Sequence, residues 1–195
     1  APVSIQFAGV TRNMRYDSRD RVIEQSESWR ETDAQGAEQT RSATSKSVYN
    51  QKGQQIESLD RLGNTTQMAY APRGRLKSVT DAQSGITQFA YDARDNLLAL
   101  TDANGNTTRF EYDANNRKTK ETRPLGQSTT YTYDAVGQLS ETVDAQGNQQ
   151  RYTHDSAGRA SKEEHLNAAG TVTRTITTSY NAIGTLTGIT DSNTG

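Results

Sequence analysis

A tyrosine recurs every 21 residues through the middle of the chain. Five tyrosines keep this spacing, a histidine takes the sixth place, and two more tyrosines lie at longer intervals; the eight marker residues are Tyr16, Tyr49, Tyr70, Tyr91, Tyr112, Tyr133, His154 and Tyr180. A fixed period of this length is the signature of stacked copies of one supersecondary unit. The sequence therefore predicts a repeat protein in which one unit starts at each marker residue.

Two turn-like strings divide each unit. The first follows the marker directly, as in Asp134-Ala135-Val136-Gly137, and the second lies halfway along, as in Asp144-Ala145-Gln146-Gly147. An Asx residue followed three places later by a residue that tolerates a left-handed backbone is typical of a type I turn that closes a hairpin through a bulge. The glycines at this fourth position that we take as defining the repeat are Gly53, Gly74, Gly137, Gly158 and Gly184 in the first string and Gly63, Gly105, Gly126 and Gly147 in the second.

The segments between the turns have the length and alternation of β-strands. Each is about six residues long, and Thr108, Phe110 and Tyr112 alternate with the polar Arg109 and Glu111. The strand after each marker is less regular. Leucines recur six residues after a marker, whereas valine, leucine or isoleucine recurs nine residues after it, and this change of parity indicates a twist or bulge that the sequence does not locate. The residues concerned are Leu76, Leu97, Leu139 and Leu186, and Val79, Leu100 and Ile189.

Two units are longer than the period. The unit from Tyr16 to Tyr49 has 33 residues, with six extra on each side of its middle turn. The unit from His154 to Tyr180 has 26 residues, with two extra before the turn and three after it. Near-equal lengthening is what an antiparallel hairpin requires, because a strand that grows must keep its partner paired.

Composition alone would favour disorder. Leu, Ile, Val and Phe make up about 14% of the 195 residues, below the ~20% that usually marks a chain too polar to fold. However, the net charge is -1, and 27 Thr with 9 Tyr supply β-forming residues. One unit has too few large apolar side chains to fold alone, so neighbours must share hydrogen bonds and stack their side chains. We therefore expect an all-β protein of tandem β-hairpin repeats of about 21 residues in a long curved antiparallel sheet.

Several classes of function are not expected from the composition. The 22 basic and 23 acidic residues are balanced, which argues against a nucleic-acid partner. No apolar run is long enough for a membrane span. There is no cysteine, so disulfides and thiolate metal sites are excluded.

The repeat resembles the YD repeat of the RHS-repeat proteins. The resemblance is carried by Tyr91-Asp92-x-x-Asp95-x-Leu97, then Thr101-Asp102-x-x-Gly105-Asn106-x-Thr108, and by Tyr133-Asp134-x-x-Gly137-x-Leu139 with Asp144-x-x-Gly147-Asn148. It extends from Tyr16 to Gly195, and the units at Tyr49 and Tyr112 depart from it through Asn50 and Arg123-Pro124. On this basis residues 1–195 are expected to be one repeat region from a longer chain.

The resemblance implies a structural role. YD repeats form a spiralling hollow β-shell that encloses a C-terminal toxin domain in exported bacterial toxins, and a related shell occurs in teneurins. The expected partners are the remaining repeats, the toxin domain and a secretion apparatus, and the expected location is outside the cell or on its surface. The family's Pro- and Asp-Pro-containing core motif is absent, since the prolines are Pro2, Pro72 and Pro124. Neither self-cleavage nor a toxin activity is therefore expected within this segment.

No catalytic, cofactor-binding or metal-binding constellation is recognisable. His154 replaces a marker tyrosine. Neither His154 nor His165 belongs to a sequence motif with the further ligands that a metal site needs. Asp102-x-Asn104-x-Asn106 resembles the start of a calcium loop, but the same spacing recurs as a turn string, which is the preferred interpretation. The tyrosines could be a packing ladder or, as the alternative function, a glycan-binding face of a cell-surface adhesion module.

Overall fold

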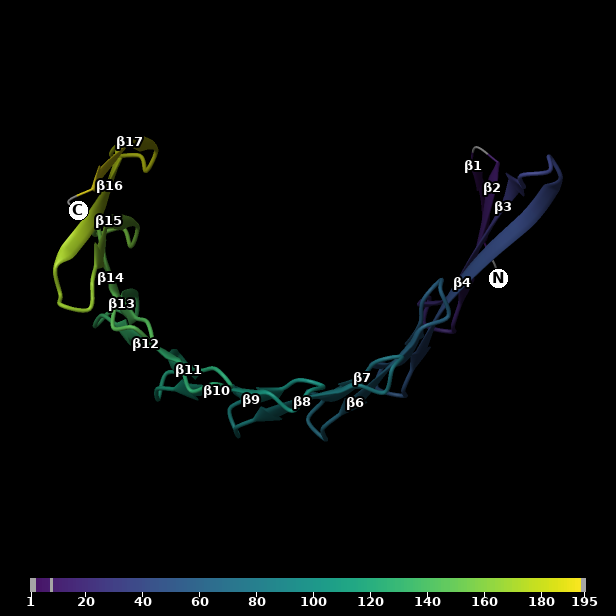
Figure 1. Cartoon of the computed structure of the whole chain (residues 1–195), viewed down its shortest axis with the longest axis horizontal. Helices are drawn as coiled ribbons and strands as arrows, with labels where there is room; N and C mark the ends of the chain where they lie inside the picture. Colours follow the sequence, from purple (N-terminus) through teal and green to yellow (C-terminus); the bar gives the residue numbers. More distant parts are fainter. Residues whose placement is uncertain (1–2, 8, 194–195) are drawn as a thin grey trace. The chain divides into compact units, whose positions relative to one another are not determined.

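The residues that the structure describes form seventeen β-strands joined by short turns (Figure 1). The computed structural model describes residues 3–7 and 9–193, and no helix, and so no membrane-crossing helix, occurs among them. The two ends of the expected repeat region, at residues 1–2 and 194–195, and residue 8 lie outside the described residues. The strands fall into two units, residues 1–90 with 101–105 and residues 91–100 with 106–195, and each unit is described by itself.

The first unit is an antiparallel sheet in which each strand pairs with the next strand along the chain. The last residue of β8 belongs to the second unit. The strands are β1 (Val3–Phe7), β2 (Val10–Tyr16), β3 (Val22–Thr32), β4 (Glu38–Tyr49), β5 (Gln55–Leu59), β6 (Thr65–Tyr70), β7 (Leu76–Thr80) and β8 (Ile86–Tyr91).

The second unit repeats this arrangement, again with antiparallel pairing in chain order. Its strands are β9 (Leu97–Thr101), whose last residue belongs to the first unit, β10 (Thr107–Tyr112), β11 (Lys118–Thr122), β12 (Ser128–Tyr133), β13 (Leu139–Val143), β14 (Gln149–His154), β15 (Ala160–Leu166), β16 (Val172–Tyr180) and β17 (Leu186–Asn193). The predicted all-β fold of tandem antiparallel hairpins is confirmed.

A β-bulge beside the marker residue explains the change of parity in the sequence. In the β6–β7 pair, Ala69 lies opposite Ser78 but Tyr70 lies opposite Leu76, so Lys77 is an extra residue. A bulge of this kind sets two residues against one and moves the following side chains to the other face. Leu76 and Val79 therefore both lie opposite residues of the face that carries Tyr70. The same shift occurs beside Tyr16, Tyr49, Tyr112, Tyr133, His154 and Tyr180.

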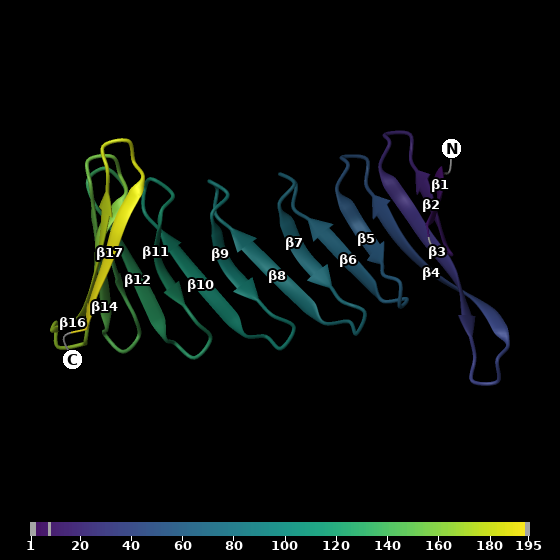
Figure 2. The ribbon, with the colours of Figure 1, turned by 90° about the horizontal axis from the view of Figure 1, so that it is seen from above.

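The two long repeats are long hairpins, as predicted. Strands β5 and β6 have 5 and 6 residues, whereas β3 and β4 have 11 and 12. Figure 2 shows the β3–β4 hairpin extending past the hairpins that follow it in its unit. Strands β15 and β16 have 7 and 9 residues, and a second bulge, between His165 and Leu166, accommodates their unequal lengths.

Very few side chains are fully covered. Among the residues whose side chains the structure describes, only Leu166 and Glu27 are buried, with 3% and 9% of their surface exposed. On a strand such as β10, the residues on the marker face are half-buried, and Arg109 and Glu111 on the other face are exposed. Each unit is thus a single-layer sheet whose marker face is partly covered by its own neighbouring side chains.

Candidate functional site

The eight marker residues occupy one equivalent position in the fold. Each is the last residue of an even-numbered strand, from Tyr16 at the end of β2 to Tyr180 at the end of β16. All eight side chains are half-buried. Each marker therefore leads directly into a turn, which we call a marker turn, and the turn at the other end of each hairpin is called a mid-repeat turn.

The fourth residue of these turns adopts a left-handed backbone. All nine glycines singled out in the sequence lie there with φ between 80° and 92°. In three marker turns the position is taken by Asp20, Asp95 or Asn116, with φ between 57° and 70°. One mid-repeat turn differs from the glycine pattern, since Ser84 rather than Gly85 has the positive φ, at 67°. Every described turn of this type thus places a residue in the conformation that the type I turn with a bulge requires.

The first residue of the turn fixes its shape by accepting backbone hydrogen bonds. In the turn after Tyr16, the Asp17 Oδ1 accepts from the backbone N–H groups of Arg19 at 2.8 Å and Arg21 at 3.1 Å. The Nε of Arg21 also donates to Asp17 Oδ2, and this hydrogen bond is the main reason that the pKa of Asp17 falls to about 2. Asn50 accepts the equivalent backbone bonds, so Asp and Asn are interchangeable in this role.

Tyrosine hydroxyl groups tie successive hairpins together. The Tyr70 hydroxyl donates to the carbonyl of Gln55 at 2.7 Å, and the Tyr133 hydroxyl donates to the carbonyl of Lys118 at 2.8 Å. Gln55 and Lys118 are both the sixth residue after the preceding marker. A tyrosine on this face thus buries its ring partly and satisfies its polar tip, which is the behaviour of a packing residue.

The residue that follows a marker turn is called the fifth position, and in several repeats its side chain reaches the next marker turn. In three repeats it is an arginine whose guanidinium carbon lies over the next marker ring, at 4.2 Å for Arg21 on Tyr49, 4.6 Å for Arg117 on Tyr133 and 4.3 Å for Arg159 on Tyr180. Where it is an amide, it forms hydrogen bonds instead.

The amides bond to the fourth residue of the next marker turn. Gln54 donates to the carbonyl of Gly74 and Gln138 to that of Gly158, both at 2.9 Å. The marker and turn patterns of the sequence do not point to the fifth position. The signal that could have revealed it is the alternation of arginine and amide in successive units, at Arg21, Gln54, Arg75, Asn96, Arg117, Gln138 and Arg159.

The residues weighed for metal or catalytic chemistry lie in ordinary structural positions. His154 is a half-buried marker at the end of β14, and the Nε2 of His165 lies 2.8 Å from the Oε1 of Glu163. Asp102 accepts a backbone hydrogen bond from Asn104 at 2.9 Å within a mid-repeat turn, as the turn interpretation expected. No group of His, Asp and Glu able to hold a metal occurs among the described residues.

Comparisons with known proteins agree with this geometry. A family model described as RHS Repeat matches residues 70–107, 91–128, 112–149 and 133–172, which together cover just over half of the chain. No curated protein matches the chain.

Solved structures show the same fold at low sequence identity. A variant of the Photorhabdus luminescens Tc holotoxin pore matches with a TM-score of 0.73 and 20% identity, over 98% of this chain and 11% of that one. The TcdB2-TccC3-Cdc42 crystal structure matches with a TM-score of 0.72 and 19% identity, over 95% of this chain and 11% of that one. For TcdB2-TccC3 the values are 0.72 and 20%, over 94% and 12%. This chain thus spans about a tenth of the length of the structures that it matches.

Proposed function

Because the chain belongs to the RHS repeat family, we propose that its hairpins form part of the wall of a hollow β-shell that encloses a C-terminal toxin domain in an exported bacterial protein. The observation that carries the proposal is the likeness of nearly the whole chain to a segment of the Tc holotoxin structures. The proposed role is structural and non-catalytic. The protein would act outside the producing cell or on its surface.

The contacts between successive hairpins support a role as part of a continuous wall. Tyrosine hydroxyls and fifth-position side chains each connect one hairpin to the next, so the most regular side chains are used for cohesion between neighbours. We propose that the eight markers and the nine turn glycines are the residues that define this repeat.

The proposed partners follow from the edges of the ladder. Strands β1 and β17 each pair with one neighbour among the described pairings, β2 and β16 respectively. Their outer edges carry backbone groups that can pair with another strand. In the proposal, further repeats of a parent chain pair there, and a toxin domain and a secretion apparatus are the other partners.

The proposal is tested by protease protection in the parent protein. Thr130 lies in β12, between β11 and β13, so Thr130→Pro removes a ladder hydrogen bond in the middle of the sheet. We expect a segment after the repeats that resists protease in the native protein and becomes cleavable in this variant. A segment that is cleaved equally fast in the unmodified protein would contradict enclosure.

The control places proline where the fold accepts it. Ala135 is the second residue of a marker turn, the position that Pro72 and Pro124 hold in turns of the same chain. Ala135→Pro should therefore leave the protection unchanged, because proline is favoured at this position of a type I turn. Protection lost in both variants would show that the effect is not specific to the ladder.

A further inference from the structure

The long β3–β4 hairpin extends past the strands on both sides of it. Strand β2 pairs with β3 only as far as Trp29, and β5 pairs with β4 only from Lys46 to Tyr49. Among the described pairings, residues 38–45 of β4 therefore pair with β3 alone. We call the free side of these residues the β4 edge, and it belongs to the part of the hairpin that projects beyond its neighbours in Figure 2.

The other long hairpin has no comparable edge. Strand β14 pairs with β15 as far as Leu166, and β17 pairs with β16 from Arg174 to Tyr180. Almost all of the β15–β16 hairpin is thus paired on both sides. The free edge is therefore a property of the β3–β4 hairpin and not a general consequence of a longer repeat.

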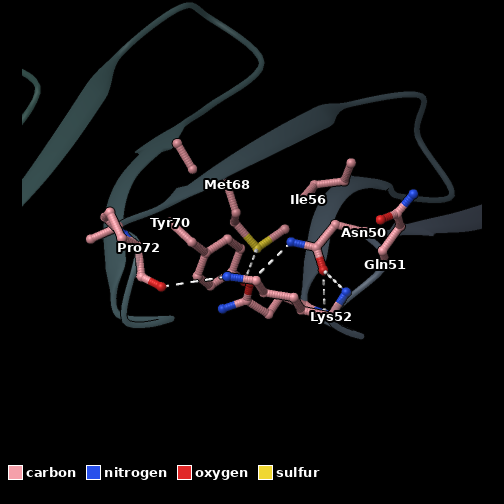
Figure 3. A pocket seen from close by; sticks show the side chains of 10 residues that line it. Asn50, Gln51, Lys52, Ile56, Met68, Tyr70 and Pro72 are labelled. Carbon is pink, nitrogen blue, oxygen red and sulfur yellow. Dashed lines mark hydrogen bonds between the residues drawn. The ribbon is translucent and has the colours of Figure 1, made fainter.

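The side-chain groove beside Tyr70, in the same unit, also differs from the β4 edge. This groove has a volume of about 520 Å³, and hydrogen bonds join several of its residues (Figure 3). Lys52 donates to the carbonyl of Pro72 at 3.4 Å, and the amide of Asn50 donates to the Oε1 of Gln54 at 2.9 Å. Contacts within the chain already hold these polar groups, whereas no strand of the described residues pairs with the β4 edge.

The hairpin turn determines which backbone groups lie on the β4 edge. The backbone N–H of Asp33 donates to the carbonyl of Ala37 at 3.0 Å. Because hydrogen-bonded and non-hydrogen-bonded pairs alternate in an antiparallel ladder, the even-numbered residues of 38–44 point their N–H and C=O groups away from β3. These residues are Glu38, Thr40, Ser42 and Thr44. The register agrees, since Lys46 is next in this series and pairs on the same side with Leu59.

A row of unpaired backbone donors and acceptors is complementary to another extended strand. A second copy of the same edge fits it when Thr40 of one copy lies opposite Thr40 of the other in an antiparallel pair. The opposing residues are then Thr40 with Thr40, Gln39 with Arg41, and Glu38 with Ser42. No like charges face each other in this register, and threonine pairs across strands are favourable.

The side chains of Gln39 and Arg41 are complementary in this register. The Nε2 of Gln39 donates to Asp33 Oδ2 at 3.2 Å, and the Nε of Arg41 donates to Glu31 Oε2 at 3.0 Å. The Oε1 of Gln39 can therefore accept a hydrogen bond from the outer nitrogens of Arg41 in the second copy.

The next two registers along the strand are less favourable. With Arg41 at the centre, two arginines would lie directly opposite each other, and like charges in that position are destabilising. With Ser42 at the centre, Glu38 of the second copy would lie opposite Lys46, on the side where β5 already pairs.

We propose that the β4 edge is an interface between two copies of this chain. The copies pair antiparallel along residues 38–42 with Thr40 on the two-fold axis, and about six backbone hydrogen bonds form between them. The inference goes beyond the proposed shell wall and does not depend on it, because it needs only the β3–β4 hairpin.

The test is sedimentation velocity of the 195-residue chain over a series of concentrations. We expect a reversible equilibrium between monomer and dimer. Thr40→Pro removes an outward N–H from each copy without breaking a hydrogen bond to β3, so it should weaken the dimer about tenfold. Thr40→Val keeps the N–H and the preference for a strand, and it should leave the dissociation constant nearly unchanged. Circular dichroism checks that each variant is folded.

Single cysteines test the register without a proline, since the chain contains no cysteine of its own. Thr40→Cys places two thiols opposite each other on the two-fold axis, so mild oxidation should cross-link the dimer. Ser42→Cys places the thiols about 13 Å apart along the ladder, too far for a disulfide, and should not cross-link it.

Three results would overturn the inference. The first is a chain that stays monomeric at every concentration, and the second is equal cross-linking of Thr40→Cys and Ser42→Cys. The third is a dimer that Thr40→Pro leaves as stable as before, which would point instead to pairing through the outer edges of β1 and β17.

Discussion

The regular hairpins and the two long hairpins are stabilised in different ways. The short hairpins, such as β5–β6 or β13–β14, contain no buried residue among those described, and their marker faces are only half-covered. The two buried residues, Glu27 on β3 and Leu166 on β15, both lie in hairpins that exceed the repeat length. The repeat alone thus builds a ladder, and added strand length provides the shielding that the repeat lacks.

The long β3–β4 hairpin uses its extra length to cover a charge. Glu27 lies opposite Arg12 of β2, which donates to it at 2.6 Å, and Arg61 from the turn after β5 approaches its other oxygen at 2.8 Å. Burial raises the pKa of Glu27, but the two guanidinium groups outweigh burial and hold the pKa below its usual value. Glu27 therefore connects the long hairpin to hairpins on both sides of it.

Leu166→Ala is expected to have the largest effect on stability. Leu166 is almost fully buried, and removal of a buried leucine side chain typically costs about 3 kcal/mol because a cavity remains. Leu139→Ala is the matched change in a short hairpin, where the side chain is half-buried, and its expected cost is about 1 kcal/mol. Urea unfolding of both variants measures the difference. Equal losses would show that shielding in the long hairpin contributes nothing special.

Glu27→Gln is expected to lower the melting temperature by several degrees at pH 7. The amide keeps the size of the side chain but leaves Arg12 and Arg61 without their counter-charge. Because the pKa of Glu27 is lowered in the folded state, its contribution is present above the ordinary value of 4.5 and is lost as the pH falls through the lowered pKa. The difference in melting temperature between Glu27→Gln and the unmodified chain should therefore become smaller below about pH 4.5.

The matched control for this charge is Glu111→Gln in a short hairpin. Glu111 pairs loosely with Lys120 at 3.6 Å, and 65% of its side chain is exposed. Such an exposed pair contributes little to stability, so the melting curves of this variant should follow those of the unmodified chain at each pH. A fall as large as that of Glu27→Gln would mean that net charge, not burial, governs both results.

The strands and turns could be predicted from the sequence because their signals are local. The alternation around Phe110 and the string from Asp134 to Gly137 each fix the conformation of a few neighbouring residues. The bulge appeared only as a change of parity between Leu76 and Val79, since its position depends on the register with the partner strand. The sequence of a single repeat therefore does not determine the register of its hairpin.

Contacts between successive repeats were harder to predict from the sequence. Arg21 covers Tyr49 and Arg61 reaches Glu27 only because turns distant in sequence lie side by side in the fold. Within its own strand, Glu27 looks like any charged residue on an exposed face. Its burial follows from the length of β3 together with two arginines from other hairpins, and the repeat pattern does not predict which residues of other hairpins will contact it.

Asp144→Asn should have the smallest effect at pH 7. Asp144 begins a mid-repeat turn, and its Oδ1 accepts from the backbone of Gln146 at 2.8 Å and of Asn148 at 2.9 Å. The oxygen of an asparagine can accept the same bonds, as Asn167 does in the next mid-repeat turn. The melting temperature at pH 7 should therefore hardly change, whereas Asp144→Ala, which removes the acceptor, should lower it measurably.

Acid conditions separate the charge of Asp144 from its turn-forming role. The hydrogen bond from the Asn148 amide is the main cause of the lowered pKa of Asp144, so the carboxylate contributes stability above its ordinary pKa of 3.8 that is lost as the pH falls through the lowered value. The Asn variant lacks this titration, and its stability should depend less on pH below about 4. If Asp144→Asn lowered the melting temperature at pH 7 as much as Asp144→Ala, the turns of the short hairpins would depend on the charge of the carboxylate. The short hairpins would then depend on a charge in the same way as the long β3–β4 hairpin depends on Glu27. That result would contradict the difference between the two kinds of hairpin.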